Sequence, residues 1–174
     1  MKTASAVSQI FFLFLLLFEA GCQLAPTAGG FSSKGDRGFD LSIYNRYAPV
    51  KIDIMPLTEF TDIGISKGGP KIKVYVSLSD SFGCQIKTPG VFRFELYEYV
   101  QRSGEPRGRR INIWPDIDLT GEVENNKYWR DFLRAYEFDL GFRPAANQNY
   151  LLQVTCLCAN GRRLSGEFVL KGAE

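Results

Sequence analysis

Apolar and polar residues alternate with a period of two along most of the chain after residue 50, as they do in half-buried β-strands. The clearest example is the segment 72–78, IKVYVSL. The same alternation predicts strands at 50–54, 92–97, 136–140, 150–158 and 164–170, with a shorter one at 111–113. Asn160-Gly161, between the last two long strands, is typical of a two-residue hairpin turn.

One segment has helical rather than strand spacing. Trp129, Phe132 and Leu133 recur at i, i+3 and i+4 within 126–134. This spacing predicts one or two helical turns that pack on the edge of the sheets.

Short strands in this number and over this length are typical of an all-β protein with a single antiparallel β-sandwich, here over residues 41–174. One detail bears on its type. Leu140 ends a strand, a loop with a proline follows, and Tyr150 opens the next strand. This resembles the corner between the fifth and sixth strands of immunoglobulin- and fibronectin-type-III-like domains, where the tyrosine hydroxyl bonds back to the loop.

The resemblance implies an immunoglobulin-like architecture and nothing more, because the Cys-Trp-Cys spacing of antibody domains is absent from the sequence. A transthyretin-like or C2-like sandwich would produce much the same alternation.

The start of the chain carries an apolar run from Ile10 to Phe18, followed by Glu19-Ala20-Gly21-Cys22. The run suits a secretory leader and is shorter than the ~20 residues that a membrane-spanning helix needs. The small-small-Cys ending resembles the lipobox of bacterial lipoprotein precursors. That resemblance implies cleavage before Cys22 and a diacylglyceryl group on its sulfur. An ordinary secretory leader, cut near Ala25 or Ala28, and an uncleaved anchor are the alternatives.

The expected organisation is a signal peptide at 1–21, a flexible lipid-anchored tether at 22–40 and the sandwich at 41–174. The expected partner is membrane lipid, joined covalently at Cys22. The expected location is therefore the cell membrane. In a bacterium with two membranes, Gln23 favours the outer membrane, because the lipoprotein family often places Asp there for retention at the inner one.

Charge and composition exclude several function classes. The 21 basic and 19 acidic side chains leave a formal net charge of +2, which is not the footprint of a nucleic-acid binder. The chain has no histidine, so histidine-based triads, general bases and zinc sites are excluded. We expect no cofactor and no enzymatic activity.

The acidic residues Asp116, Asp118, Glu122 and Glu124 lie close together in the sequence. They are interpreted as solvated carboxylates at the rim of the sandwich. A calcium site or the carboxylate pair of a small hydrolase are the alternatives.

Three cysteines remain besides Cys22: Cys84, Cys156 and Cys158. Cys156 and Cys158 share the apolar face of a predicted strand, which suits small buried side chains. A disulfide from Cys84 to one of them is an alternative, and a metal or redox site is another.

Four arginines, Arg102, Arg107, Arg109 and Arg110, are predicted to lie in a long hairpin loop after the strand at 92–99. This loop is either a solvated connection or a contact for anionic lipid headgroups or acidic glycans. The expected function is a lipid-anchored bacterial envelope protein whose non-catalytic sandwich binds or scaffolds another envelope protein. A hydrolase and a structural spacer are the alternatives.

Overall fold

The computed structural model describes residues 47–61 and 69–172, so the predicted leader, Cys22 and the tether at 22–40 lie outside the described residues. The chain divides into two units, Met1–Phe39 and Asp40–Glu174, and every described residue belongs to the second. In the described part, no helix is both long and apolar enough to span a bilayer.

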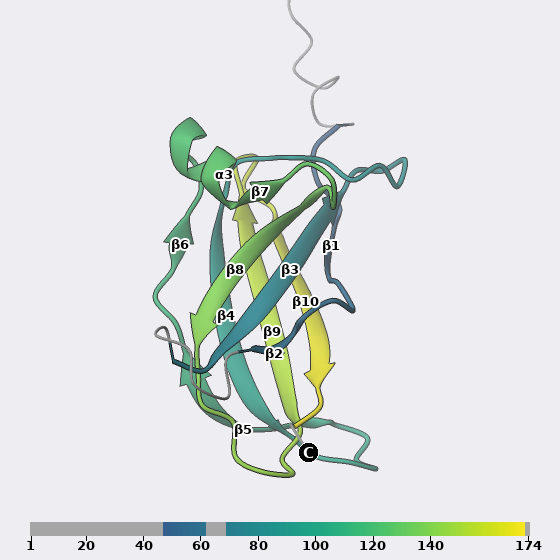
Figure 1. Cartoon of the computed structure of the whole chain (residues 1–174). Helices are drawn as coiled ribbons and strands as arrows, with labels where there is room; N and C mark the ends of the chain where they lie inside the picture. The colour runs from purple at the N-terminus through teal and green to yellow at the C-terminus, as the bar shows by residue number, and fades with distance from the viewer. Residues whose placement is uncertain (1–46, 62–68, 173–174) are drawn as a thin grey trace, which may run out of the picture. The chain divides into compact units, whose positions relative to one another are not determined.

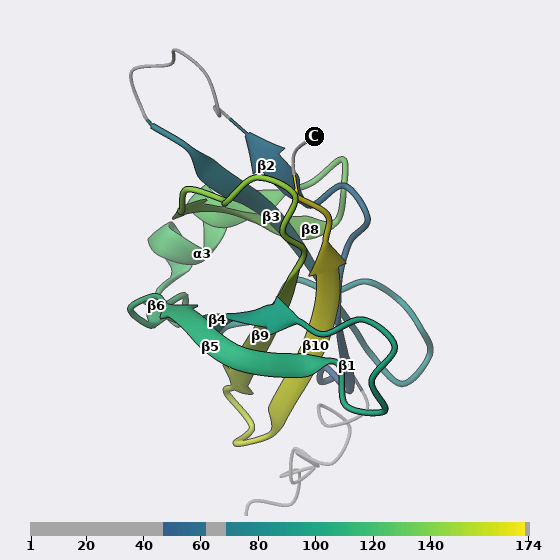
Figure 2. The same ribbon diagram turned by 90° about the horizontal axis from the view of Figure 1, so that it is seen from below.

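Two antiparallel sheets face one another and confirm the predicted all-β sandwich (Figures 1 and 2). The first sheet has the order β1 (Lys51–Ile54), β3 (Lys71–Ser79), β8 (Ala135–Gly141), β7 (Trp129–Arg130), and β2 (Glu59–Thr61) also pairs with β3. The second sheet has the order β10 (Arg163–Leu170), β9 (Tyr150–Cys158), β4 (Gly90–Tyr99), β5 (Arg107–Ile113), and β6 (Ile117–Asp118) also pairs with β4.

The connections cross between the layers in the manner of a Greek key. β3 pairs with β1 and β8 in the first sheet, whereas β4, which follows β3 in the chain, lies beside β9 in the second. The two layers therefore contain β1, β3 and β8 on one side and β4, β9 and β10 on the other.

The core follows directly from the alternation in the sequence. Ile72, Val74, Val76 and Leu78 of β3 are fully buried, and alternate residues of β4, β8 and β9 meet them from both sheets. Phe138 packs against Phe94 across the layers at a ring-centroid distance of 4.8 Å. Each such side chain stabilises the fold by ~1.5–3 kcal/mol relative to an exposed position.

The hydrogen bond expected at the corner before β9 is present. The buried hydroxyl of Tyr150 accepts a hydrogen bond from the backbone N–H of Ala145 at 2.8 Å and donates to Gln148 Oε1 at 3.3 Å. The side chain therefore fastens the loop between β8 and β9 to the start of β9.

The helix prediction at 126–134 was wrong in its bounds. The helix α3 (Glu122–Tyr128) begins four residues earlier, and Trp129 and Arg130 then pair with β8 as β7. Phe132 lies in the turn after β7 and is 83% exposed rather than packed on an edge. The i, i+3, i+4 spacing here belongs to a short strand and a tight turn, because Trp129 pairs with Tyr136 of β8 and packs edge-on against its ring.

A buried polar cluster holds α3 against one end of the sandwich. Asn125 Nδ2 donates to the carbonyl oxygens of Leu119 at 2.8 Å and Thr88 at 3.1 Å. The Tyr136 hydroxyl donates to the Thr88 carbonyl at 2.7 Å and accepts from the Thr88 N–H at 2.9 Å. The amide and the hydroxyl thus satisfy backbone groups that would otherwise be buried without partners.

The turn between β9 and β10 is longer than predicted. Cys158 N–H bonds to Arg162 O and Gly161 N–H bonds to Cys158 O, so the loop contains three residues, Ala159 to Gly161. Gly161 has a φ of +79°, as required after a type I turn in a three-residue hairpin.

Candidate binding surface

The predicted arginine loop is largely a strand. β5 begins at Arg107, so only Arg102 of the four arginines lies in the connection after β4, where it has a φ of 57°. Arg107, Arg109 and Arg110 lie on β5 instead. Sequence reasoning missed the start of β5 because glycine, proline and adjacent charges resemble a loop, whereas pairing with β4 and the cross-strand ion pairs Arg109–Glu98 and Arg110–Glu95 support a strand here.

Each of these three arginines is paired with a glutamate. Arg109 Nη2 lies 2.9 Å from Glu98 Oε1, and Arg110 Nη1 lies 2.9 Å from Glu95 Oε1. Arg107 pairs with Glu167 of β10, and its guanidinium lies 5.0 Å from the ring centroid of the half-buried Tyr97. The predicted cationic patch is therefore largely neutralised by its own neighbours, which weakens its attraction for anionic headgroups.

In a different part of the same sheet, one arginine has no partner among the described residues. On the outer face of the second sheet, Arg163, Leu157 and Val91 form one row across β10, β9 and β4. The next row consists of Ser165, Thr155 and Arg93. A shallow depression of about 200 Å³ lies between these rows and is lined by Val91, Arg93, Asp116, Thr155, Leu157 and Arg163. We call it the β9 depression.

The two guanidinium groups at the β9 depression differ in their pairing. Arg93 binds Asp116 through two bonds, Nε to Oδ1 and Nη2 to Oδ2, both 2.8 Å long. This pairing raises the pKa of Arg93 and lowers that of Asp116, because each hydrogen bond favours the charged forms. Arg163 is exposed and has no hydrogen bond or ion pair from its side chain to any described residue.

The β9 depression therefore combines a cation without a partner in the described part of the chain, a hydroxyl and exposed aliphatic surface. Leu157 is 52% exposed, and Thr155 Oγ1 lies 3.1 Å from Ser165 Oγ. Such a surface suits a partner segment that carries a carboxylate next to an apolar side chain. The strand alternation already placed Leu157 opposite the core residues of β9. An apolar residue on the polar face was the signal that sequence reasoning did not use.

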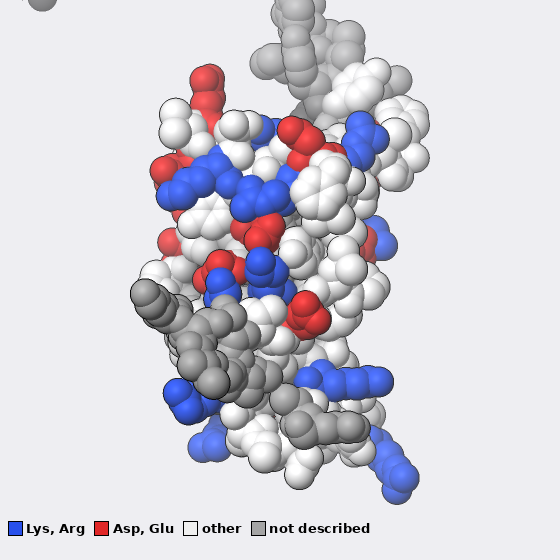
Figure 3. All heavy atoms as spheres, viewed as in Figure 1, with Lys and Arg blue, Asp and Glu red and all other residues white. Residues whose placement is uncertain are grey.

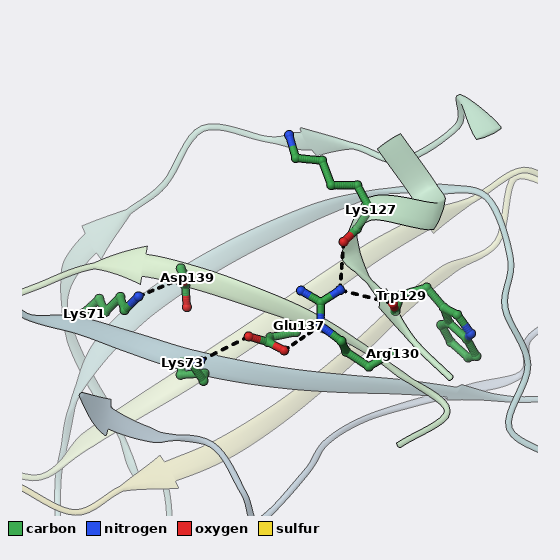
Figure 4. Close-up of polar contacts among 7 residues, drawn as sticks. All are labelled: Lys71, Lys73, Lys127, Trp129, Arg130, Glu137 and Asp139. Atoms are coloured by element: carbon green, nitrogen blue, oxygen red, sulfur yellow. Dashed lines mark hydrogen bonds and ion pairs between the residues drawn. The ribbon is translucent and has the colours of Figure 1, made fainter. Parts of the chain in front are cut away.

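The outer face of the first sheet has a different character. Positive and negative side chains alternate over it (Figure 3). Lys71 Nζ lies 2.9 Å from Asp139 Oδ2, and Lys73 Nζ lies 3.2 Å from Glu137 Oε1. Glu137 also accepts a 2.7 Å hydrogen bond from Arg130 Nε (Figure 4).

Glu137 is the centre of this network. Burial alone would raise its pKa, but the hydrogen bonds from Arg130 and Lys73 outweigh burial, so the pKa is lowered. Arg130 Nη1 also donates to the backbone carbonyls of Lys127 at 2.8 Å and Trp129 at 3.2 Å. These charged side chains hold β3, β8 and β7 together. Because they already bind one another, few of their polar groups are available to a partner.

The structure separates the acidic residues that the sequence grouped together. Asp116 is held by Arg93, and Asp118 Oδ1 accepts hydrogen bonds from the Thr120 hydroxyl at 2.6 Å and backbone N–H at 2.9 Å. Glu122 and Glu124 lie in the first turn of α3, with Glu124 3.5 Å from Lys127 Nζ. These hydrogen bonds lower the pKa of both aspartates, whereas a general acid needs a raised pKa.

The three described cysteines are free thiols. Cys84 is exposed in the loop after β3, whereas Cys156 and Cys158 are buried with their sulfur atoms 3.9 Å apart. Burial raises the pKa of both buried thiols. Within the described residues, no group of three or more His, Cys, Asp or Glu side chains could hold a metal ion.

Comparison of the chain with family models, with curated proteins and with solved structures found no match in any of the three.

Proposed function

We propose that this chain is a lipid-anchored protein of the bacterial envelope whose sandwich binds another envelope protein through the β9 depression. The anchor is Cys22, and in a bacterium with two membranes the location is the outer membrane. The proposal of an anchor rests on the leader and on the Ala20-Gly21-Cys22 sequence.

The observation that carries the binding role is the contrast between the two outer faces. The charges of the first sheet are joined into an ion-pair network, whereas Arg163 on the second sheet, beside the half-exposed Leu157, has no ion pair with any described residue. A specific partner can bury partially exposed apolar surface and, at the same time, form an ion pair with the charge beside it. A hydrolytic role for the acidic residues has less support, because the pKa of both Asp116 and Asp118 is lowered.

The anchor is tested by the intact mass of the protein extracted from membranes. We expect a chain that begins at Cys22 and carries added diacylglyceryl mass, and we expect the Cys22→Ser variant to lack that mass. A chain cut near Ala25 or Ala28, without lipid, would contradict the anchor.

The binding role is tested by photo-crosslinking in living cells, with a photoreactive amino acid at Leu157 or, as a matched control on the other sheet, at Tyr75. We expect a discrete crosslinked product from position 157 alone. Arg163→Ser should reduce that product without changing the protein's abundance. Equal products from both positions, or none from either, would contradict a binding surface on the second sheet.

A further inference from the structure

Exposed apolar side chains gather at one end of the sandwich. The four most exposed large apolar residues of the described part are Phe132 at 83%, Val123 at 80%, Phe82 at 68% and Tyr47 at 61%. They belong to four separate segments: the turn after β7, helix α3, the loop between β3 and β4, and the residues before β1.

Contacts through the β3–β4 loop bring these segments together. The rings of Tyr47 and Phe82 lie 6.2 Å apart. Further along the same loop, the Thr88 carbonyl accepts from Asn125 of α3 and Lys87 Nζ lies 2.8 Å from Asn126 Oδ1. Figure 1 shows α3 and β7 at this end, opposite the end where β5 begins and β8 ends.

The exposed side chains stand on segments that hydrogen bonds hold in place. Asp80 Oδ1 accepts from the backbone N–H groups of Phe82 and Cys84, each at 2.9 Å. The turn around Phe132 is closed by the 2.6 Å bond from Trp129 Nε1 to Asp131 Oδ1. The fold therefore holds these apolar side chains in exposed positions. Exposed apolar surface of this kind marks an interaction site.

The number of residues between Cys22 and the sandwich bears on which partner this end can reach. Tyr47 contacts Phe82 at this end just before β1 begins at Lys51, so the chain enters the sandwich here, with Tyr47 25 residues after Cys22. The flexible tether that the sequence predicts would, over that length, span ~25–30 Å between its ends. The opposite end lies further away by the length of β3, ~26 Å for nine residues.

We propose that this end, formed by Tyr47, Phe82, Val123 and Phe132, rests in the headgroup region of the bilayer to which Cys22 is anchored. This inference rests on the proposed lipid anchor. The partner is the apolar–polar boundary of the bilayer, where aromatic side chains are favourable. The four segments that carry these residues hold Lys87, Lys127 and Arg134 against Asp80, Glu122, Glu124 and Asp131, so the inferred contact rests on the apolar side chains rather than on a net positive charge of these segments.

This arrangement has a consequence for the rest of the molecule. With one end on the membrane, the strands run away from the bilayer, and the β9 depression, formed at the start of β4, the end of β9 and the start of β10, lies near the membrane surface.

The chain's two tryptophans provide the test, because they lie at opposite ends. Trp129 precedes the Phe132 turn, whereas Trp114 bonds to the carbonyl of Gly141, at the far end of β8. Membrane-extracted protein is reconstituted into phosphatidylcholine vesicles that contain brominated lipid, which quenches tryptophan on close approach. Trp114→Phe leaves only Trp129 as the reporter, and Trp129→Phe leaves only Trp114.

We expect strong quenching of Trp129 and little quenching of Trp114, at low and at high salt. The combined variant Phe82→Ser, Val123→Ser, Phe132→Ser should abolish this difference while the protein still floats with the vesicles. The matched control, Leu57→Ser with Val100→Ser, changes apolar residues that are 52% and 44% exposed and should leave the difference intact.

Flotation and quenching separate the two proposals. Protein that floats but shows equal quenching of both tryptophans overturns the docking inference and leaves the anchor standing. Protein that does not float and carries no lipid by mass overturns the anchor, and the inference with it.

Discussion

One hydroxyl group, that of Tyr150, joins the loop between β8 and β9 to the second sheet. The Tyr150 hydroxyl accepts a 2.8 Å hydrogen bond from the Ala145 N–H. The tyrosine side chain is only 1% exposed, so water cannot readily replace this acceptor. At the scale of single residues, the fold depends on a few such polar groups that are buried and satisfied, the Asn125 amide among them.

Replacing Tyr150 with Phe should lower the free energy of unfolding by ~1–2 kcal/mol, because the Ala145 N–H loses its acceptor in a partly buried loop. Urea denaturation should show a lower midpoint with an unchanged slope. Tyr99→Phe is the control, since no described residue hydrogen-bonds to its hydroxyl, and its effect should stay within ~0.5 kcal/mol. Equal effects of the two substitutions would show that the corner bond contributes nothing.

At the scale of elements, Gly166 is the point where the edges of the two sheets approach each other. β1 ends the first sheet and β10 ends the second, and the two strands contact each other there. A Cβ atom at position 166 would lie 2.8 Å from the carbonyl oxygen of Ile52 in β1. The atoms that block this space belong to the backbone of β1 rather than to a flexible side chain. An added Cβ would therefore push β1 and β10 apart.

Gly166→Ala should therefore destabilise the sandwich by ~1–3 kcal/mol, as over-packing does. Gly141→Ala is the matched control within a strand, because no atom of the described residues lies within 4 Å of its added Cβ. Thermal or urea unfolding of both variants distinguishes them. A Gly166→Ala variant as stable as Gly141→Ala would mean that β1 is not held against β10.

At the scale of the whole molecule, the two sheets enclose the Cys156 and Cys158 thiols, whereas Cys84 remains exposed. Burial raises the pKa of both enclosed thiols, so at pH 8 they carry less of the reactive thiolate than an exposed cysteine does. Their modification therefore requires the sandwich to open.

We expect the Cys22→Ser protein to present one rapidly reacting thiol to a disulfide reagent at pH 8 and two that react only as fast as the molecule unfolds. In denaturant all three should react at once. Cys84→Ser, added to this background, should remove the rapid phase. A second rapid thiol in the native protein would contradict the burial of the pair.

The strands that the sequence predicted correctly are those that alternate over many residues. β3 and β9 extend for nine residues each with one face in the core, so their pattern repeats often enough to exclude a helix. β6 and β7, at two residues each, contain no period and were missed. The Trp129–Leu133 spacing mimicked a helix because too few apolar residues were present to distinguish a turn.

The candidate surface was less predictable than the fold. Arg93, Leu157 and Arg163 lie on three different strands, and only the pairing of β4 with β9 and of β9 with β10 brings them together. The arginines of β5 show the converse. They were conspicuous in the sequence, but their glutamate partners at positions 95, 98 and 167 neutralise them in the fold.

The sequence by itself determined the all-β class, the in–out orientation of the long strands and the corner at Tyr150, because these depend on local periodicity and on neighbours along the chain. Only the tertiary structure decided which charges are neutralised, where the exposed apolar residues gather and which strands share a sheet. Those properties arise from residues far apart in the chain, such as Arg107 with Glu167 and Tyr47 with Phe82, and local patterning carries no information about such pairs.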